Sequence, residues 1–123
     1  MLPTFVGADD DVDPSLPSLR EALEARWLDL TRRVLPGLAV ERGWPIRRDH
    51  CFQRVLLDAT FGGVWYVHVA RRPAYRVMSD VDLARATELA ESAATDATDV
   101  VDLNARSLAY RGKLATTERL SAD

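Results

Sequence analysis

Residues 18–37 read SLREALEARWLDLTRRVLPG and contain the clearest helix signal in the chain. Ser18 and Glu21 have the spacing of a capping box, in which two side chains satisfy free backbone N–H groups at a helix start. Apolar side chains then recur at steps of three and four residues, which places them on one helix face: Leu19, Leu23, Trp27, Leu30 and Val34. Pro36 and Gly37 predict the end of this helix, because proline lacks a backbone N–H.

A second helix is predicted where Asp49 can act as the N-cap. Its inward face carries apolar residues at helical spacing, and Gly62-Gly63 predicts its end: Phe52, Val55, Leu56 and Ala59. Between the two helices, residues 38–42 favour a short helical turn that ends at Gly43. Trp44 then precedes Pro45 and is expected to be extended.

Two further helices follow from the same kinds of signal. Ser79 and Asp82 resemble a capping box, and the apolar pattern continues to about residue 94. Asp99 is the expected N-cap of a last helix, which we predict to end at Gly112. The predicted inward sides of the two helices are Leu83, Ala86, Leu89, Ala90 and Ala93 in the first, and Val100, Leu103, Ser107 and Leu108 in the second.

Residues 64–69, VWYVHV, fit either a strand or a short helix. Their β-branched and aromatic content favours a strand. No second segment resembles a strand that could pair with this one, so we predict a short helix. The chain is therefore expected to be all-α, a single domain of four longer helices plus one or two short ones in an orthogonal or bundle-like arrangement.

Length and composition limit the type of protein. The 123 residues suffice for one domain, which we place at residues 18–113, between an acidic, flexible N-terminal arm (1–17) and a C-terminal tail (114–123). One Cys and two His exclude an internal disulfide and a closed zinc site, so no metal is expected. Apolar runs are too short to span a membrane, and we expect a soluble, cytoplasmic protein.

The net charge of −3 is unevenly distributed. Residues 1–18 contain four Asp and no basic residue. Residues 42–76 contain seven Arg and two Asp, a local net charge of +5: Arg42, Arg47, Arg48, Arg54, Arg71, Arg72 and Arg76. Arginine can bind carboxylate or phosphate through two parallel hydrogen bonds, so the middle of the chain is a candidate for anion recognition.

Three clusters of residues could form a site. The first is Asp49-His50-Cys51 at a predicted helix start, where the helix dipole can lower the pKa of a thiol. His50 and Cys51 are therefore candidate catalytic groups, with Asp49 beside them. His50 is the more plausible general acid or base near neutral pH. The alternative is that Cys51 is a small buried apolar residue and that Asp49 only caps the helix.

The second cluster interleaves aromatic and basic residues: Trp65, Tyr66, His68, Arg71, Arg72, Tyr75 and Arg76. Such residues can stack on a ring and bind a phosphate, or they can form an amphipathic connector with its arginines in water. The third cluster, Asn104, Ser107 and Arg111, forms a polar stripe on the last helix. Its side chains either satisfy polar groups of another helix or line a pocket.

The residues of these clusters also carry a resemblance. The chain resembles a family of small, uncharacterised microbial proteins in five segments: Asp49-His50-Cys51-Phe52, Leu57-Asp58, Phe61 to Tyr66, Arg72 to Arg76, and Leu103 to Lys113. Some members are labelled GNAT-like acetyltransferases. This sequence lacks the acetyl-CoA loop of that superfamily, Gln/Arg-x-x-Gly-x-Gly/Ala, and its mixed sheet. The resemblance therefore implies a common fold and a common site, without supplying a reaction or a cofactor.

These features lead to two main hypotheses. In the first, the three clusters converge on a cleft that binds a small anionic molecule, with Arg72, Arg76 and Arg111 holding phosphate or carboxylate groups. In the second, the basic segment 42–76 is an exposed surface for nucleic acid or protein, and the acidic arm competes for it. A third interpretation is a scaffold or homodimer with an exposed apolar face. The sequence leaves open whether the chain is an enzyme.

Overall fold

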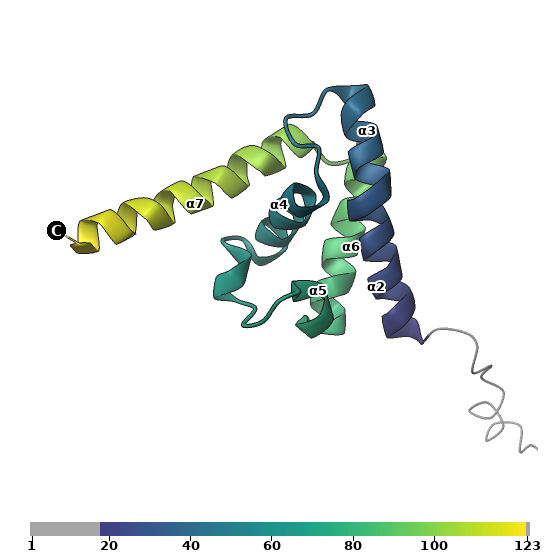
Figure 1. The fold of residues 1–123 in the computed structure, drawn as a ribbon, viewed down its shortest axis with the longest axis horizontal. Coiled ribbons are helices and arrows are strands. Elements are labelled where there is room, and N and C mark those ends of the chain that lie inside the picture. Colours follow the sequence, from purple (N-terminus) through teal and green to yellow (C-terminus); the bar gives the residue numbers. More distant parts are fainter. Residues whose placement is uncertain (1–17, 123) are drawn as a thin grey trace, which may run out of the picture.

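The computed structural model describes the backbone of residues 18–122 and the side chains of residues 18–112, so the predicted arm at 1–17 lies outside the described residues. It confirms an all-α single domain (Figure 1). The helices are α2 (Leu19–Asp29), α3 (Leu35–Arg42), α4 (Asp49–Phe61), α5 (Ala74–Val77), α6 (Asp80–Ala94) and α7 (Val100–Ala122), with a π-helical turn η1 (Leu30–Val34) and a 3-10 turn η2 (Trp65–Val67).

The first helix does not end at Pro36-Gly37, as we predicted, but runs through η1 into α3 and ends at Gly43. The wide turn η1 explains the difference. The N–H of Leu35 bonds to the carbonyl of Leu30, five residues back. Pro36 therefore lies in the first turn of α3, where a backbone N–H has no partner within the helix and its absence costs little. Gly43, at φ 65°, then ends the helix in the left-handed conformation.

The predicted start of α2 is confirmed, because the Ser18 hydroxyl accepts from the N–H of Glu21 and the reciprocal bond is present. Leu19, however, is 92% exposed and does not belong to the buried stripe. The N-cap of α4 is Arg48 instead of the predicted Asp49. Asp49 is the first helical residue, where its carboxylate accepts from the N–H of His50 at 2.8 Å and still lies at the positive end of the helix dipole.

The end of α4 and the start of α6 agree with prediction: Gly62 ends α4 at φ 68°, and the Ser79 hydroxyl caps α6. Residues 64–69 contain the short helical turn η2 and no strand. The last helix does not end at Gly112 but continues to Ala122, because glycine in a helix interior costs only about 1 kcal/mol. Leu108, expected to face inward, is exposed, whereas Ser107 is buried.

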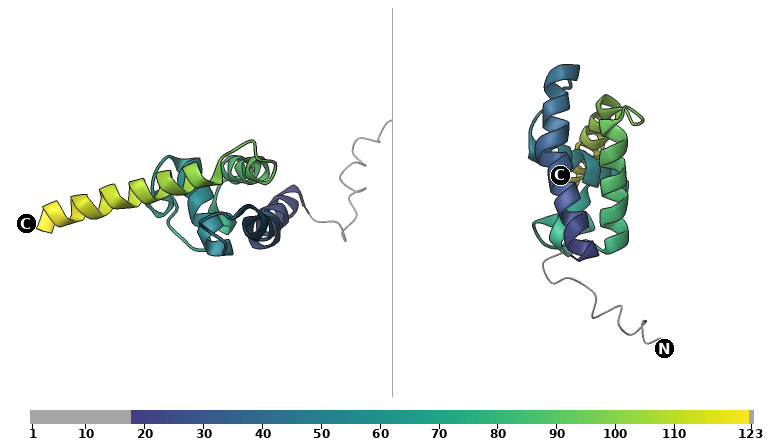
Figure 2. Two further views of the ribbon diagram at one scale, coloured as in Figure 1. Left: turned by 90° about the horizontal axis from the view of Figure 1, so that it is seen from above. Right: turned by 90° about the vertical axis from the view of Figure 1, so that its right-hand side faces the viewer.

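The core lies where three helices meet. α2 and α6 run side by side, and α4 packs across α6 and against α7 (Figures 1 and 2). α7 packs mainly on α4 and extends away from the other helices. Trp27, Phe52 and Leu83, from α2, α4 and α6, are almost fully buried between them. None of the helices in the described part of the chain is both long and apolar enough to cross a membrane.

Candidate functional site

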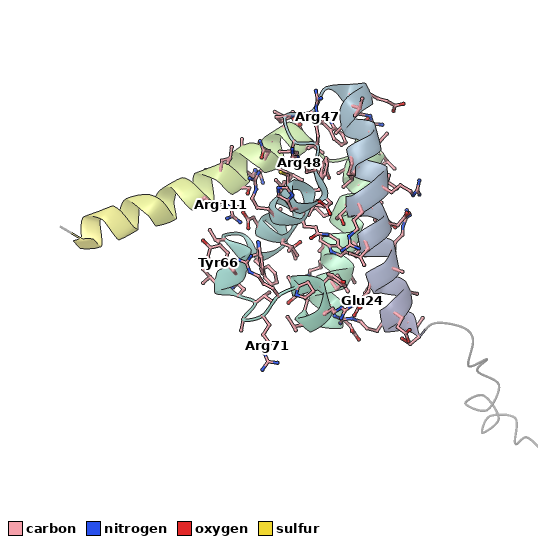
Figure 3. The ribbon with its side chains drawn as sticks, in the orientation of Figure 1. Glu24, Arg47, Arg48, Tyr66, Arg71 and Arg111 are labelled. Carbon is pink, nitrogen blue, oxygen red and sulfur yellow. The ribbon has the colours of Figure 1, made fainter. Side chains whose placement is uncertain are left out.

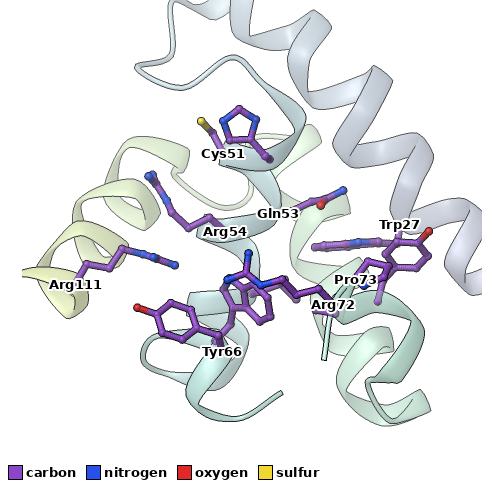
Figure 4. Close-up of a pocket in the computed structure, with 13 residues that line it drawn as sticks. Trp27, Cys51, Gln53, Arg54, Tyr66, Arg72, Pro73 and Arg111 are labelled. Atoms are coloured by element: carbon purple, nitrogen blue, oxygen red, sulfur yellow. The ribbon is translucent and has the colours of Figure 1, made fainter. Parts of the chain in front are cut away.

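A cleft of about 410 Å³ lies between the middle of α4 and the segments around it (Figure 4). Its walls come from α2, α4, η2, the segment before α5, α5 itself and α7. The lining includes residues from all three clusters that the sequence singled out, although these clusters are up to about sixty residues apart along the chain. The crossing of α4 over its neighbours therefore brings them to one place.

From the first cluster, His50 and Cys51 line the cleft, and Asp49 does not. His50 is exposed, and its Nδ1 lies 3.7 Å from a carboxylate oxygen of Asp49. Cys51 is half-buried and is the one cysteine of the chain. The structure records no hydrogen bond between the imidazole of His50 and the thiol of Cys51, as expected for adjacent residues that point about 100° apart on a helix.

From the second cluster, Trp65, Tyr66, Arg72 and Tyr75 line the cleft. The guanidinium of Arg72 lies 5.1 Å from the centre of the Trp65 ring, and the Trp65 and Tyr66 rings meet edge to face at 5.9 Å. Both contacts are typical of cation–π and aromatic pairs. Arg72 is exposed to solvent, and its contact with Trp65 places the guanidinium along the wall of the cleft.

Three members of the second cluster lie elsewhere. His68 stacks on Phe61 at 5.2 Å, and it lines a separate hollow together with Arg71. Figure 3 shows Arg71 extending away from the molecule. Arg76 is exposed and lies over the Tyr75 ring, outside the lining. Proline at position 73 turns the chain between Arg72 and Arg76, and so the two arginines have different surroundings.

In the third cluster, the polar stripe of α7 is organised by Asp58, whose side chain is fully buried in α4. The Ser107 hydroxyl donates to this carboxylate at 2.6 Å, and Arg111 donates to both of its oxygens at 3.1 and 3.2 Å. The backbone N–H of Trp65 donates to it at 3.0 Å. Ser107 is therefore a structural residue, whereas Arg111 is held by Asp58 and also lines the cleft.

Asn104, the third residue of the stripe, does not line the cleft. Its side-chain oxygen accepts a hydrogen bond of 2.6 Å from one terminal nitrogen of Arg54. The Nε of Arg54 is buried and has no hydrogen-bond partner in the described structure. A buried unpaired donor of a charged group is costly. Arg54 as a residue also lines the cleft.

Six lining residues were not predicted as site residues: Trp27, Gln53, Arg54, Leu57, Pro73 and Ala74. Two of them, Arg54 and Leu57, could have been found, because they follow His50 at the spacing of one helix face. The apolar spacing around Trp27 predicted only a core residue, and Trp27 is indeed 1% exposed. Asp58 was noted through the resemblance but not as a site residue, and no local pattern shows that it would bind Arg111.

The lining of the cleft is basic and aromatic. It contains three Arg, one His, two Trp and two Tyr, and no Asp or Glu. Asp58, which does not line the cleft, pairs with Arg111 and offsets its charge. Arg54 and Arg72 have no carboxylate partner in the described structure. No group of three or more His, Cys, Asp or Glu residues that could bind a metal occurs in the described part of the chain.

A comparison with protein-family models, curated proteins and solved structures found no significant match to this chain. Its function is therefore inferred from the chemistry of the cleft.

Proposed function

We propose that the cleft binds a small molecule that combines a phosphate or carboxylate group with a planar apolar body. The observation that carries this proposal is the composition of the lining, which has three Arg and no acidic residue. Positive groups brought together in a concave site favour an anion more strongly than they would on an open surface.

The cleft has one end with two arginines and Tyr66, whose ring lies 5.6 Å from the Arg111 guanidinium, and another end that is apolar (Figure 4). Arg54 and Arg111 lie at one end, Trp27 and Pro73 at the other, and Arg72 lies between them (Figure 4). An anionic group at the first end would meet the guanidinium N–H groups of Arg54 and Arg111 that are not bonded to Asn104 and Asp58. A flat apolar group at the second end would meet aromatic and proline surfaces. The ligand class is therefore an amphipathic anion that fits into about 410 Å³.

This assignment changes the roles expected from the sequence. Arg72 and Arg111 keep the role of anion-binding residues, Arg54 joins them, and Arg76 is left out because it lies outside the lining. Among the aromatic residues, Trp65 and Tyr75 are the proposed contacts for the apolar body. His50 and Cys51 lie on the wall of the same cleft, so His50 is the proposed acid or base for any chemical step on a bound ligand.

The alternative, an exposed surface for nucleic acid, is less well supported by the arrangement of the arginines. Of the seven in residues 42–76, Arg54 and Arg72 line the concave cleft, and Arg42 is paired with Asp96 at 2.6 Å. Arg47 and Arg48 lie in the loop before α4, whereas Arg71 lies at the opposite end of the molecule (Figure 3). Phosphates of one strand would need a continuous basic surface.

The proposal predicts tighter binding of 2-naphthyl phosphate than of either inorganic phosphate or 2-naphthol, because only the first fills both ends of the cleft. Tryptophan fluorescence or calorimetric titration measures the three dissociation constants. Arg72→Gln should weaken binding of 2-naphthyl phosphate by about 10-fold or more, the effect of losing a hydrogen bond to a charged group.

Arg71→Gln is the matched control, since it removes the same charge from the neighbouring residue, which does not line the cleft. It should leave the dissociation constant within about twofold of wild type. Equal losses in the two variants would contradict the proposal. So would tight binding of a short oligonucleotide whose affinity falls steeply with salt, which is the behaviour of a phosphate-binding surface.

A further inference from the structure

We propose that Gln53 determines which ligands the cleft accepts, because its side-chain oxygen selects a planar group that carries an N–H donor. The inference rests on the proposed function and narrows its ligand class. An anion with any flat apolar body becomes an anion attached to a heteroaromatic ring with a ring N–H, such as an indole.

The hydrogen bonds around Thr31 fix the orientation of the Gln53 amide. Thr31 lies in the π-helical turn η1 and is fully buried where η1 packs against α4. Its hydroxyl donates to the backbone carbonyl of Trp27 at 2.9 Å, and a carbonyl oxygen can only accept. Because a hydroxyl has one hydrogen, the Thr31 oxygen accepts from the Gln53 amide nitrogen, at 3.1 Å. The side-chain oxygen of Gln53 is thereby turned away from Thr31.

This oxygen is a free acceptor on a residue that lines the cleft. Gln53 is half-buried, and no hydrogen bond from the described residues reaches its side-chain oxygen. Among the described residues, the one buried side-chain polar atom without a partner is the Nε of Arg54, so the Gln53 oxygen has solvent access. The lining contains no Asp, Glu or Asn, and Gln53 therefore supplies its one side-chain carbonyl oxygen.

The position of Gln53 indicates which part of a ligand it would contact. In Figure 4 its side chain extends from α4 toward Trp27, on the far side of the cleft from Arg111. Gln53 and Arg54 are adjacent on α4, and adjacent helical side chains point about 100° apart. The donor is therefore expected on the ring, away from the anionic group. A ring that covers the Gln53 oxygen without a donor leaves it unpaired, which weakens binding.

The test compares two acids of the same shape by calorimetric titration. Indole-3-acetate has a ring N–H, and in 1-benzothiophene-3-acetate a sulfur atom replaces that N–H. The same two rings with propionate side chains form a second pair, which places the carboxylate farther from the ring. In at least one pair the wild type should bind the indole acid about fivefold more tightly, the effect of one neutral hydrogen bond. Gln53→Met has no side-chain oxygen and should reduce this ratio to less than about twofold.

Thr31→Val tests the orienting contact without changing the lining. It removes the hydroxyl that holds the Gln53 amide, so the preference for the indole acid should fall, and Thr31→Ser should restore it. The matched control is Thr87→Val in α6. The buried Thr87 hydroxyl also donates to the carbonyl four residues back, at 2.8 Å, but Thr87 does not line the cleft and accepts no bond from a side-chain amide in the described structure. This variant should keep the wild-type ratio.

Equal binding of the indole and benzothiophene acids in both pairs would overturn the inference, and the proposed function would still stand if 2-naphthyl phosphate binds. A preference for the indole acid that persists in Gln53→Met would also overturn it, because another group would then accept the N–H. So would a wild-type ratio in Thr31→Val. Failure of 2-naphthyl phosphate and all four acids to bind would overturn the proposed function as well.

Discussion

Asp58 shows how one side chain can join several parts of a small domain. Its carboxylate is fully buried, and it accepts hydrogen bonds from Ser107, Arg111 and the backbone of Trp65. These donors belong to α7 and to η2, whereas Asp58 itself belongs to α4. A buried carboxylate is tolerated only when its lone pairs are satisfied, and here they are. Asp58 is therefore a positioning residue for Arg111 at the cleft.

At this scale we predict that Asp58→Ala lowers the free energy of unfolding by about 3 kcal/mol, measured by urea denaturation. The Ser107 hydroxyl and the Trp65 N–H lose their partner; Ser107 is almost fully buried and Trp65 is half-buried. Arg111 is 29% exposed and can be partly rehydrated, which keeps the loss near the lower end of the range for broken buried pairs.

Glu91→Ala is the control for this prediction, since it removes an acid from the exposed ion pair with Arg26. It should cost at most about 1 kcal/mol. A similar loss in the two variants would mean that Asp58 contributes no more than a surface charge.

Among the elements, the glycines show how backbone conformation decides the effect of a substitution. A Cβ atom added at Gly37, Gly43 or Gly62 would meet no atom within 4 Å, so space is available at all three. Gly43 and Gly62 end their helices at φ 65° and 68°, where a side chain is strained, whereas Gly37 lies inside α3 with no positive φ. Whether a Gly→Ala substitution stabilises or destabilises the fold at these three positions therefore depends on the φ angle.

At the element scale we predict opposite effects for two Gly→Ala changes. Gly37→Ala should raise the thermal midpoint of unfolding, with a gain of about 0.5–1 kcal/mol, because alanine favours the helix and restricts the unfolded chain. Gly62→Ala should lower it by about 1–2 kcal/mol, the cost of placing a Cβ in the left-handed conformation. Effects of the same sign in the two variants would contradict this explanation.

On the scale of the whole molecule, the cleft is a property of the packing of several elements. Its walls come from α2, α4, α5 and α7, together with η2 and the segment before α5. α4 is central, because it packs against both α6 and α7 and carries four lining residues besides Leu57: His50, Cys51, Gln53 and Arg54. A ligand that contacts all these walls would join α7 and η2, which pack on α4, to α2 and α5, which pack on each other.

A consequence at this scale concerns hydrogen exchange. Bound 2-naphthyl phosphate at about 100 times its dissociation constant should slow globally exchanging amides by about 100-fold, which corresponds to roughly 2.7 kcal/mol. The slowing should include core amides of α2, α4 and α6, because the ligand binds only the folded state. Protection confined to the segment around Tyr66 and Arg72 would instead indicate a local contact at the surface.

Much of the secondary structure could be predicted from the sequence, because its signals act within a few residues. The capping box of Ser18, the cap of α6 at Ser79 and the left-handed glycine at Gly62 all appear as expected. The same local signals failed at Pro36 and Gly112. There a π-helical turn and the small cost of an interior glycine let the helices continue.

The sequence by itself determined which residue types are available for a site and that they occur in three clusters. Only the tertiary structure decided which of them meet. His50, Arg72 and Arg111 lie at one cleft because α4 crosses its neighbours there, whereas His68, Arg76 and Asn104 lie outside its lining. The physical reason is that helix crossing and the burial of Asp58 depend on contacts between residues about fifty positions apart, which local spacing does not encode.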